Sequence, residues 1–274
     1  WSSDVCSSDL GIQDIQYDYY GSLLACAVRD NTIQIYDTTK DVPVLVATLK
    51  GHTAPVWQVK WGHPRFGSLL VSCGYDGIVN VWRRSQDNEY SIVYQYKHHT
   101  KSVNTICVFP ETEGLKIACG SSDGEVSVIE YVEGTKSWKS NSFIAHQSGV
   151  NAVEVMCQGN EVVLITGGCD SIVKLFHYNN GKWECFKELK DHKDWIRGIA
   201  AAVHDNKHVF ASCSQEGLVN VYEYTNDVKR LYSLPQFKSG CWKVAFNATA
   251  DILAVTTADG DVSFWENGKQ IESQ

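Results

Sequence analysis

The sequence has no long apolar run and no cluster of positive charge. Among its 274 residues no apolar stretch exceeds six, as in Val42–Ala47, and a membrane-spanning helix needs about 20. Lysine and arginine total 24 against 32 acidic residues, and they never run longer than two. A protein that binds nucleic acid through its phosphates needs a basic face, and this chain has a net charge of −8. These absences exclude a membrane-spanning helix and argue against direct binding of nucleic acid.

Methionine and proline are also scarce, with one and five residues. Apolar residues form no helical stripe longer than about two turns. Aromatic residues are frequent instead, because nine Trp, 13 Tyr and nine Phe stand beside 21 Gly. Aromatic and β-branched residues favour strands, and glycine marks the turns between them. The composition therefore predicts an all-β protein.

The ten cysteines include no C-x-x-C pair, the spacing that zinc ribbons and thioredoxin-like sites use. The chain is long for a disulfide-stapled domain, and no basic and apolar signal segment opens it. Five cysteines fall in apolar stretches just before a turn, where a thiol acts as a small buried hydrophobe: Cys26, Cys73, Cys119, Cys169 and Cys213. We therefore expect reduced, structural thiols in a cytosolic protein.

The first ten residues, Trp1–Leu10, match nothing that follows them. They are rich in Ser and Asp and show no strand alternation. We expect them to be a non-native or disordered leader, and residues 11–274 to form a single domain.

An internal repeat organises this domain. An acidic residue in a turn recurs six times, at intervals of 43 to 47 residues: Asp30, Asp76, Asp123, Asp170, Glu216 and Asp259. A large apolar side chain follows each after six residues: Tyr36, Trp82, Ile129, Phe176, Tyr222 and Trp265. A histidine precedes four of them by 24 residues: His52, His99, His146 and His192. Three spacings kept over four to six copies indicate six repeats of one unit.

Each repeat has the local sequence of a small antiparallel sheet. Asp76-Gly77, Asp123-Gly124 and Asp259-Gly260 predict two-residue hairpin turns in which both residues have positive φ. The flanking strands, such as Leu69–Cys73 and Ile78–Trp82, are apolar on both faces, as expected for strands packed between two other sheets. Six units of this kind predict a six-bladed β-propeller.

The set His52, Ser72, Asp76 and Trp82 resembles the WD-repeat family, whose blades each contain a hydrogen-bonded chain of these residue types. The resemblance implies a structural network in four blades, with substitutions in three of them. Blade three has His99 and Asp123 with Cys119 and Ile129; blade four has His146, Thr166 and Asp170 with Phe176; blade five has His192, Ser212 and Glu216 with Tyr222. Blades one and six lack the histidine.

Histidine–carboxylate pairs could also be catalytic or metal-binding. Their recurrence once per blade argues against this, because an enzyme needs one site, whereas buried polar groups everywhere need partners. Adjacent His98 and His99 resemble metal ligands, but only His99 is in register and no third ligand lies near in sequence. We therefore predict no enzyme, no catalytic residue, no cofactor and no metal.

Segments between these anchors resemble the Sec-thirteen family of WD-repeat proteins in particular, over about residues 11–269. They are Asp18–Gly21, Pro55–Pro64, Ala118–Gly124, Gly167–Asp170, Asp194–Arg197 and Ala211–Gln215. This family builds the outer cage of the COPII vesicle coat and the Y-shaped scaffold of the nuclear pore. The resemblance implies a non-enzymatic scaffold at the endoplasmic reticulum, on COPII vesicles and at the nuclear pore. It also implies an α-solenoid partner that donates a β-blade, with no small-molecule substrate and membrane association only through the coat.

The sequence also predicts an open ring. The first expected strand, Ile12–Tyr17, already belongs to blade one, and Gln270–Glu272 ends blade six, so no segment is left to join them. The expected partner-binding residues are Leu24, Ile33, Ile35, Leu253, Val262 and Phe264.

Two alternatives remain at this stage. One is the sister six-bladed propeller of the nuclear pore. The other is a WD-repeat adaptor that binds peptides, which should show aromatic and charged side chains clustered at its narrow mouth.

Overall fold

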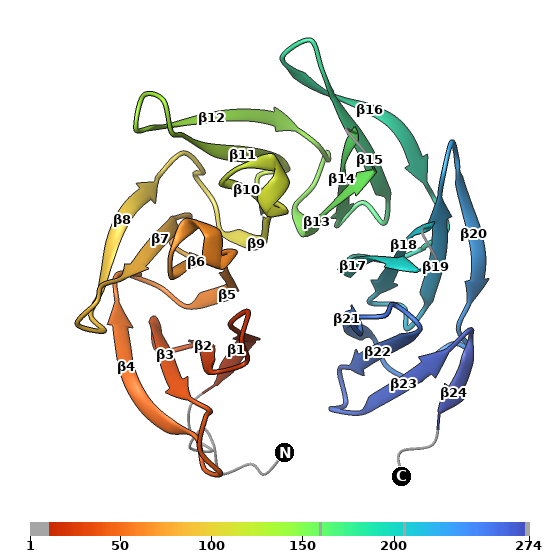
Figure 1. Cartoon of the computed structure of the whole chain (residues 1–274). Helices are drawn as coiled ribbons and strands as arrows, with labels where there is room; N and C mark the ends of the chain where they lie inside the picture. Colours follow the sequence, from red (N-terminus) through yellow and green to blue (C-terminus); the bar gives the residue numbers. More distant parts are fainter. Residues whose placement is uncertain (1–10, 159–160, 205–206, 272–274) are drawn as a thin grey trace. The chain divides into compact units, whose positions relative to one another are not determined.

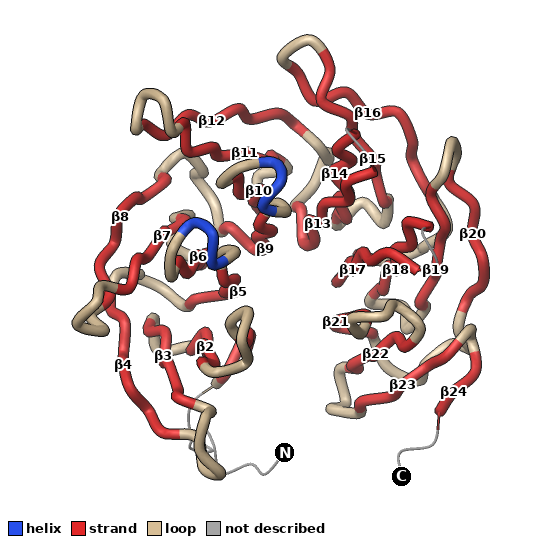
Figure 2. The backbone as a smooth tube through the Cα atoms, in the orientation of Figure 1, coloured by secondary structure: helices blue, strands red, loops and turns tan. Residues whose placement is uncertain are grey.

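The computed structural model describes residues 11–158, 161–204 and 207–271 (Figure 1). Figure 2 shows strands joined by turns, and the only helices in these ranges are two 3₁₀ turns, Pro64–Phe66 and Glu111–Glu113. No described helix has the length and hydrophobicity to cross a membrane. The all-β prediction is confirmed. The expected leader, Trp1–Leu10, lies outside the described residues.

The chain divides into two compact units, and the first, ending at Ser142, contains three four-stranded antiparallel sheets. Blade one is β1 (Ile12–Tyr17), β2 (Leu23–Val28), β3 (Thr32–Asp37) and β4 (Val44–Lys50). Blade two is β5 (Val56–Trp61), β6 (Leu69–Gly74), β7 (Val79–Arg84) and β8 (Tyr90–Tyr96). Blade three is β9 (Val103–Val108), β10 (Lys116–Ser121), β11 (Glu125–Val132) and β12 (Ser137–Ile144).

The second unit, from Phe143 onward, contains the other three sheets of the described residues. Blade four is β13 (Val150–Gln158), β14 (Glu161–Gly168), β15 (Val173–Asn179) and β16 (Lys182–Leu189). Blade five is β17 (Ile196–His204), β18 (Lys207–Ser214), β19 (Val219–Tyr224) and β20 (Val228–Ser233). Blade six is β21 (Cys241–Phe246), β22 (Ile252–Thr257), β23 (Val262–Glu266) and β24 (Lys269–Ile271). In each blade the strands pair in chain order, which confirms the predicted class, a six-bladed β-propeller.

In the first unit the second strand of each blade buries both of its faces, as its apolar sequence predicts. In blade two every residue of β6 is buried. Leu70 packs in a cluster with Ile33 of blade one, whereas its neighbour Val71 packs in a cluster with Ile117 of blade three. The outer strand β4 is mostly exposed instead. Hydrophobic contact between sheets therefore holds the blades of this unit together.

The turns between the second and third strands differ from the prediction. Gly77 has a φ of 75° and Gly124 a φ of 89°, but the aspartate before each does not have positive φ. The N–H of Gly77 donates to the carbonyl of Gly74, and the N–H of Gly124 to that of Ser121. This is a type I turn followed by one left-handed residue, so the prediction of positive φ at both residues is wrong. The three-residue loop leaves the aspartate side chain free to reach a histidine elsewhere in the blade.

Replacing Gly77 with alanine should destabilise the fold more than replacing Gly21, although both glycines have a left-handed φ. A Cβ at Gly77 would lie 2.9 Å from the carbonyl oxygens of His99 and Lys101, whereas none of the atoms around Gly21 comes within 4 Å. The left-handed conformation alone costs about 1–2 kcal/mol, and the backbone clash adds to that cost for Gly77→Ala. Urea unfolding of both variants measures this difference, and equal losses would contradict the close approach of blade three to this turn.

Candidate functional site

In blade two the structure brings the four residues of the expected network into one chain of hydrogen bonds. His52, in the loop before β5, has its Nδ1 2.9 Å from Asp76 Oδ2 and its Nε2 2.8 Å from Ser72 Oγ. Trp82 Nε1 donates to the same hydroxyl at 2.9 Å. Asp76 also accepts from the backbone N–H of Thr53 at 2.9 Å. The network therefore ties the loop before β5 to the turn between β6 and β7.

Blade four repeats this arrangement without its last member. His146 Nδ1 lies 2.9 Å from Asp170 Oδ1, and its Nε2 lies 2.8 Å from Thr166 Oγ1. Phe176 stands where blade two has Trp82, and its ring has no donor for the hydroxyl. The histidine and its two partners thus hold this blade as a three-residue network.

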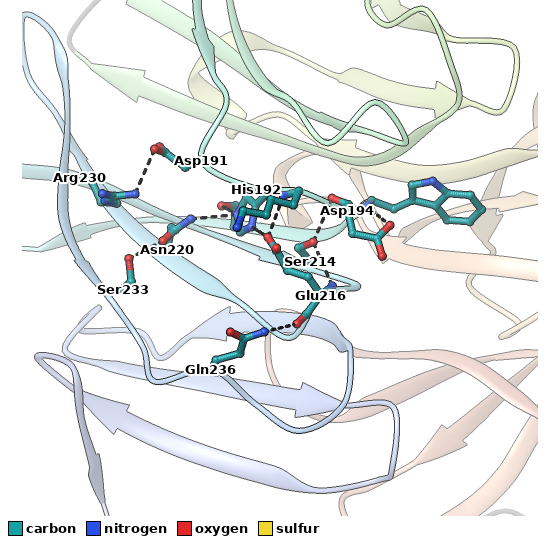
Figure 3. A network of polar contacts seen from close by, with 12 residues as sticks. Asp191, His192, Asp194, Ser214, Glu216, Asn220, Arg230, Ser233 and Gln236 are labelled. Atoms are coloured by element: carbon teal, nitrogen blue, oxygen red, sulfur yellow. Dashed lines mark hydrogen bonds and ion pairs between the residues drawn. The ribbon is translucent and has the colours of Figure 1, made fainter.

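Blade five keeps the network although its turn carries a glutamate (Figure 3). His192 Nδ1 lies 3.1 Å from Glu216 Oε1, and its Nε2 lies 2.8 Å from Ser212 Oγ. The hydroxyl of Tyr222 donates to Asp191 Oδ2 at 3.1 Å. Because the longer Glu216 side chain still reaches the histidine, the departure from Asp does not break the contact.

Further polar contacts surround the histidine of blade five (Figure 3). Asn220 Nδ2 lies 3.2 Å from His192 Nε2, and Ser233 Oγ donates to Asn220 Oδ1 at 2.6 Å. Gln236 Nε2 donates to the backbone oxygen of Glu216 at 3.1 Å. These bonds link the histidine to β19, β20 and the segment that leads to blade six.

Blade three keeps its network through a residue that the sequence analysis missed. His99 Nδ1 lies 3.2 Å from Asp123 Oδ2, and its Nε2 lies 3.0 Å from Ser127 Oγ on β11. Cys119, which replaces the usual hydroxyl residue, is 3.6 Å from the same nitrogen. Tyr96 donates to Ser127 at 3.1 Å, in the role that Trp82 has in blade two. The tryptophan position itself, Ile129, is buried in the core.

A polar residue four positions after the turn acid supplies the missing partner wherever the hydroxyl or histidine is absent. In blade three this residue is Ser127. In blade six Ser263 accepts from Trp265 Nε1 at 2.8 Å, and in blade one Gln34 accepts from the Tyr36 hydroxyl at 2.6 Å. One polar residue recurring inside an otherwise apolar strand was the signal that could have revealed these partners.

Three of the four network histidines have lowered pKa values because they are buried. Burial lowers the pKa of His146 and of His192, and the acidic partners Asp170 and Glu216 only partly offset this. Burial likewise lowers the pKa of His99. The same imidazole–carboxylate contact recurs in four blades with its polar atoms paired inside the sheets. This repetition places a similar stabilising contact in blades two to five and favours no single reaction centre.

Four of the five cysteines that the sequence places before turns are buried, as expected for structural thiols: Cys26, Cys73, Cys119 and Cys213. Cys169 is only partly buried. Burial raises the pKa of Cys119 to about 12. A thiol with so high a pKa carries little thiolate at neutral pH and is a poor nucleophile.

The outer face of blade six differs from the same face of every other blade. This face is formed by alternate residues of the inner strands: Lys243, Ala245, Ile252, Ala254, Thr256, Val262, Phe264 and Glu266. Val262 is 58% exposed and Phe264 is 42% exposed. The residues at these two positions in blades one to five are at most 8% exposed: Ile33, Val79, Val126, Val173 and Val219 for the first, and Ile35, Val81, Val128, Leu175 and Val221 for the second. Blade six therefore exposes apolar side chains at two positions that are buried in each of the other blades.

The same register explains where the other expected partner-binding residues lie. Ile33 and Ile35 occupy the positions of Val262 and Phe264, but in blade one this side is covered by Val59 and Leu70 of blade two. The expectation that Ile33 and Ile35 lie on a free face is therefore wrong.

Leu253 and Leu24 are also buried. Leu253 points to the opposite side of blade six and packs against blade five, so it does not belong to the outer face either. Leu24 lies on the side of blade one away from blade two, where it is buried against Cys26, Val28 and Tyr36. Alternate residues of a strand point to opposite faces of the sheet. When both faces are apolar, the sequence does not show which face packs on the preceding blade and which on the following one.

A second exposed feature lies at the start of β17 and β21. The guanidinium of Arg197 lies 5.0 Å from the ring centre of Trp195 and 4.6 Å from that of Trp242. Its Nε donates to Gln215 Oε1 at 2.8 Å, which fixes the plane of the group. Both indoles are about half exposed. This is a preorganised aromatic and cationic surface of the kind that proteins use for contacts.

The comparisons with known proteins agree with this architecture. The family model described as "WD domain, G-beta repeat" matches residues 43–83, 90–130, 138–177 and 183–223, so the chain is a WD-repeat protein. Each match runs from the outer strand of one blade through three strands of the next, as in β4 to β7.

Relatives with similar sequences identify a particular family of WD-repeat proteins. The Drosophila melanogaster protein named "Protein SEC13 homolog" is 35% identical over 273 residues, covering 92% of this chain and 76% of that protein. The Emericella nidulans "Protein transport protein sec13" is 34% identical over 281 residues, covering 93% and 90%. A Cryptococcus neoformans protein of the same name is 33% identical over 305 residues, covering 94% and 91%. The chain belongs to the Sec13 family.

Removing the hydroxyl at the centre of a network should destabilise blades two and three alike. Ser72→Ala leaves His52 and Trp82 without their shared partner, and Ser127→Ala does the same to His99 and Tyr96. Each should cost about 1–3 kcal/mol of unfolding free energy, because buried polar groups are left unpaired. Urea unfolding measures both, with the exposed Ser137→Ala as the control. If Ser127→Ala behaved like the control, the substitute network in blade three would be disproved.

The unfolding free energy should fall as the pH drops from about 7.5 to 5.5. The folded-state pKa values of His99, His146 and His192 are lowered, so the unfolded chain binds more protons below its own histidine pKa of about 6.5. Stability is therefore complete above that pH and is lost below it, by up to about 1.4 kcal/mol per pH unit for each proton taken up. Urea titrations at several pH values measure the slope, which should be smaller in His146→Gln. A slope that His146→Gln leaves unchanged would show that this imidazole is not the titrating group.

Proposed function

We propose that this chain is a non-enzymatic scaffold subunit of the COPII vesicle coat, which carries cargo from the endoplasmic reticulum to the Golgi, and of the nuclear pore complex. Membership of the Sec13 family supports this role, and relatives bear the name "Protein transport protein sec13". The chain would act at the cytoplasmic face of the endoplasmic reticulum, on coated vesicles and at the nuclear pore. Its partners are an α-solenoid coat subunit and an α-solenoid nucleoporin that each donate a β-blade.

The exposed outer face of blade six is the observation that carries this proposal. Large apolar side chains such as Val262 and Phe264 gain free energy when a partner removes them from water. In blade one the corresponding face obtains this burial from the sheet of blade two. A partner that lays strands on blade six supplies the missing neighbour in the same geometry.

The donated strands would bind through two kinds of contact. Their apolar side chains pack on the blade-six face, and their own strand pairing keeps the backbone polar groups satisfied. Specificity would come from the fit of these side chains to Ile252, Val262 and Phe264. No group transfer is involved, and the recurrent histidine networks support a structural role.

The peptide-binding alternative has one observation in its favour. The surface formed by Trp195, Arg197 and Trp242 combines exposed aromatic rings with a fixed cation, as a site for an acidic peptide would. The names of the relatives favour the Sec13 family over the sister nuclear-pore propeller. Trp242→Ala separates the remaining two functions, because it should leave solenoid binding intact and abolish binding to an acidic peptide surface.

Introducing charge on the blade-six face should break the scaffold contact. Phe264→Glu and Val262→Glu should each weaken binding to the α-solenoid partner at least about tenfold, because the partner would have to remove a carboxylate from water. Leu231→Glu is the matched control, since Leu231 is also 42% exposed but lies on the outer strand of blade five. Isothermal titration calorimetry measures the affinity, and circular dichroism confirms folding. If the folded variants bind like the control, the donated blade docks elsewhere.

A further inference from the structure

Blade three brings two imidazoles and two carboxylates together at one end of the sheet. His98 and His99 lie in the loop before β9, and Asp123 and Glu125 lie at the turn before and at the start of β11. His99 Nδ1 is 3.2 Å from Asp123 Oδ2 and 3.9 Å from Glu125 Oε2. His98 Nε2 is 3.1 Å from the same Glu125 oxygen. No third metal ligand lies near His98 and His99 in the sequence, but the fold brings two carboxylates, Asp123 and Glu125, close to them.

The other three histidine-containing blades have no such set. Each has the histidine and the turn carboxylate, but the two added ligands are missing. At the position of His98 they have Gly51, Ala145 and Asp191, and at the position of Glu125 they have Ile78, Ile172 and Leu218. The structural network therefore does not require His98 or Glu125, and these two residues are an addition peculiar to blade three.

The spacing of the donor atoms suits one small cation. Zinc binds imidazole nitrogen and carboxylate oxygen at about 2.0–2.2 Å, so neighbouring ligands in a tetrahedron lie about 3.3–3.6 Å apart. One donor atom each from His99, Asp123 and Glu125 falls in a group whose members all lie within 4.8 Å of one another. The His98 side chain is 45% exposed, so it can turn to complete the set. We propose that His98, His99, Asp123 and Glu125 form a zinc-binding site.

Hydrogen bonds from neighbouring residues orient the proposed zinc ligands. Ser127 Oγ lies 3.0 Å from His99 Nε2 and receives a hydrogen bond from Tyr96, which leaves a lone pair to accept the Nε2–H. A metal-bound histidine characteristically donates its second ring N–H in this way, which turns the Nδ1 lone pair toward the metal. The backbone N–H of Glu125 holds Asp123 Oδ1 at 3.0 Å and leaves Oδ2 for the cation. The ligands are thus oriented before metal arrives.

The charge of the cluster also favours a dication. Asp123 and Glu125 form ion pairs only with the two histidines within the described part of the chain. Two carboxylates then balance one Zn²⁺. With four protein ligands the site is closed and structural, and the metal would fasten the loop before β9 to the turn before β11.

The test titrates zinc into the metal-stripped full chain by isothermal titration calorimetry. The expected result is one zinc per chain, with a dissociation constant at least tenfold larger in His98→Gln and in Glu125→Gln. Glu130→Gln is the matched control, because it removes a partly exposed carboxylate from the same strand, one that pairs with Lys139 outside the cluster. The control should bind zinc within twofold of the unaltered chain. Magnesium should not bind, because imidazole is a poor ligand for it.

A cobalt(II) spectrum separates this site from the cysteines. Binding to nitrogen and oxygen ligands gives tetrahedral bands without a thiolate-to-cobalt charge-transfer band. Saturating zinc should also raise the melting temperature of the chain and not that of His98→Gln. Zinc affinity unchanged in both variants, a thiolate band, or no zinc binding at micromolar concentration would each overturn the proposal. Equal melting temperatures of the metal-free proteins establish that the variants fold.

Discussion

The second strand of each blade, such as β2 and β6, is largely apolar on both faces, and this constraint shapes the rest of the structure. A sheet of such strands is stable only with another sheet on each side, as blade two has in blades one and three. Blade six has blade five on one side, while Val262 and Phe264 on its other side remain exposed. The feature that holds the blades together thus also leaves one face suited to a partner.

The buried networks fix each blade internally so that its faces can be presented rigidly. An imidazole bridges the turn acid and a hydroxyl in blades two, four and five, and Ser127 takes over the hydroxyl role in blade three. The three-residue loop makes this possible, because its left-handed glycine or serine turns the carboxylate back toward the histidine. Stability spread over repeated networks suits a scaffold, which has to resist deformation and has no reaction to perform.

Sequence reasoning reached the repeat, the strands and the histidine–carboxylate pairs, because each depends on local spacing that recurs. It did not predict the side of the sheet to which Ile33 and Leu253 point, because the sequence of a strand that is apolar on both faces does not show which face packs on which neighbouring blade. The turn type was missed because Asp-Gly suits both a two-residue and a three-residue loop. The cluster around Glu125 was missed because its members are 24 to 27 residues apart and meet only through strand pairing. Local rules therefore predicted the elements, and packing decided which surfaces remain free.

Amide hydrogen exchange of the full chain, alone and bound to the proposed α-solenoid partner, tests the central claim most directly. The account predicts new protection on binding in β22 and β23, where Ile252, Val262 and Phe264 become covered, and unchanged exchange around Trp195 and Arg197. Protection confined to the Trp195–Arg197 surface, with β22 and β23 exchanging as in the free chain, would contradict the claim that blade six receives the donated strands.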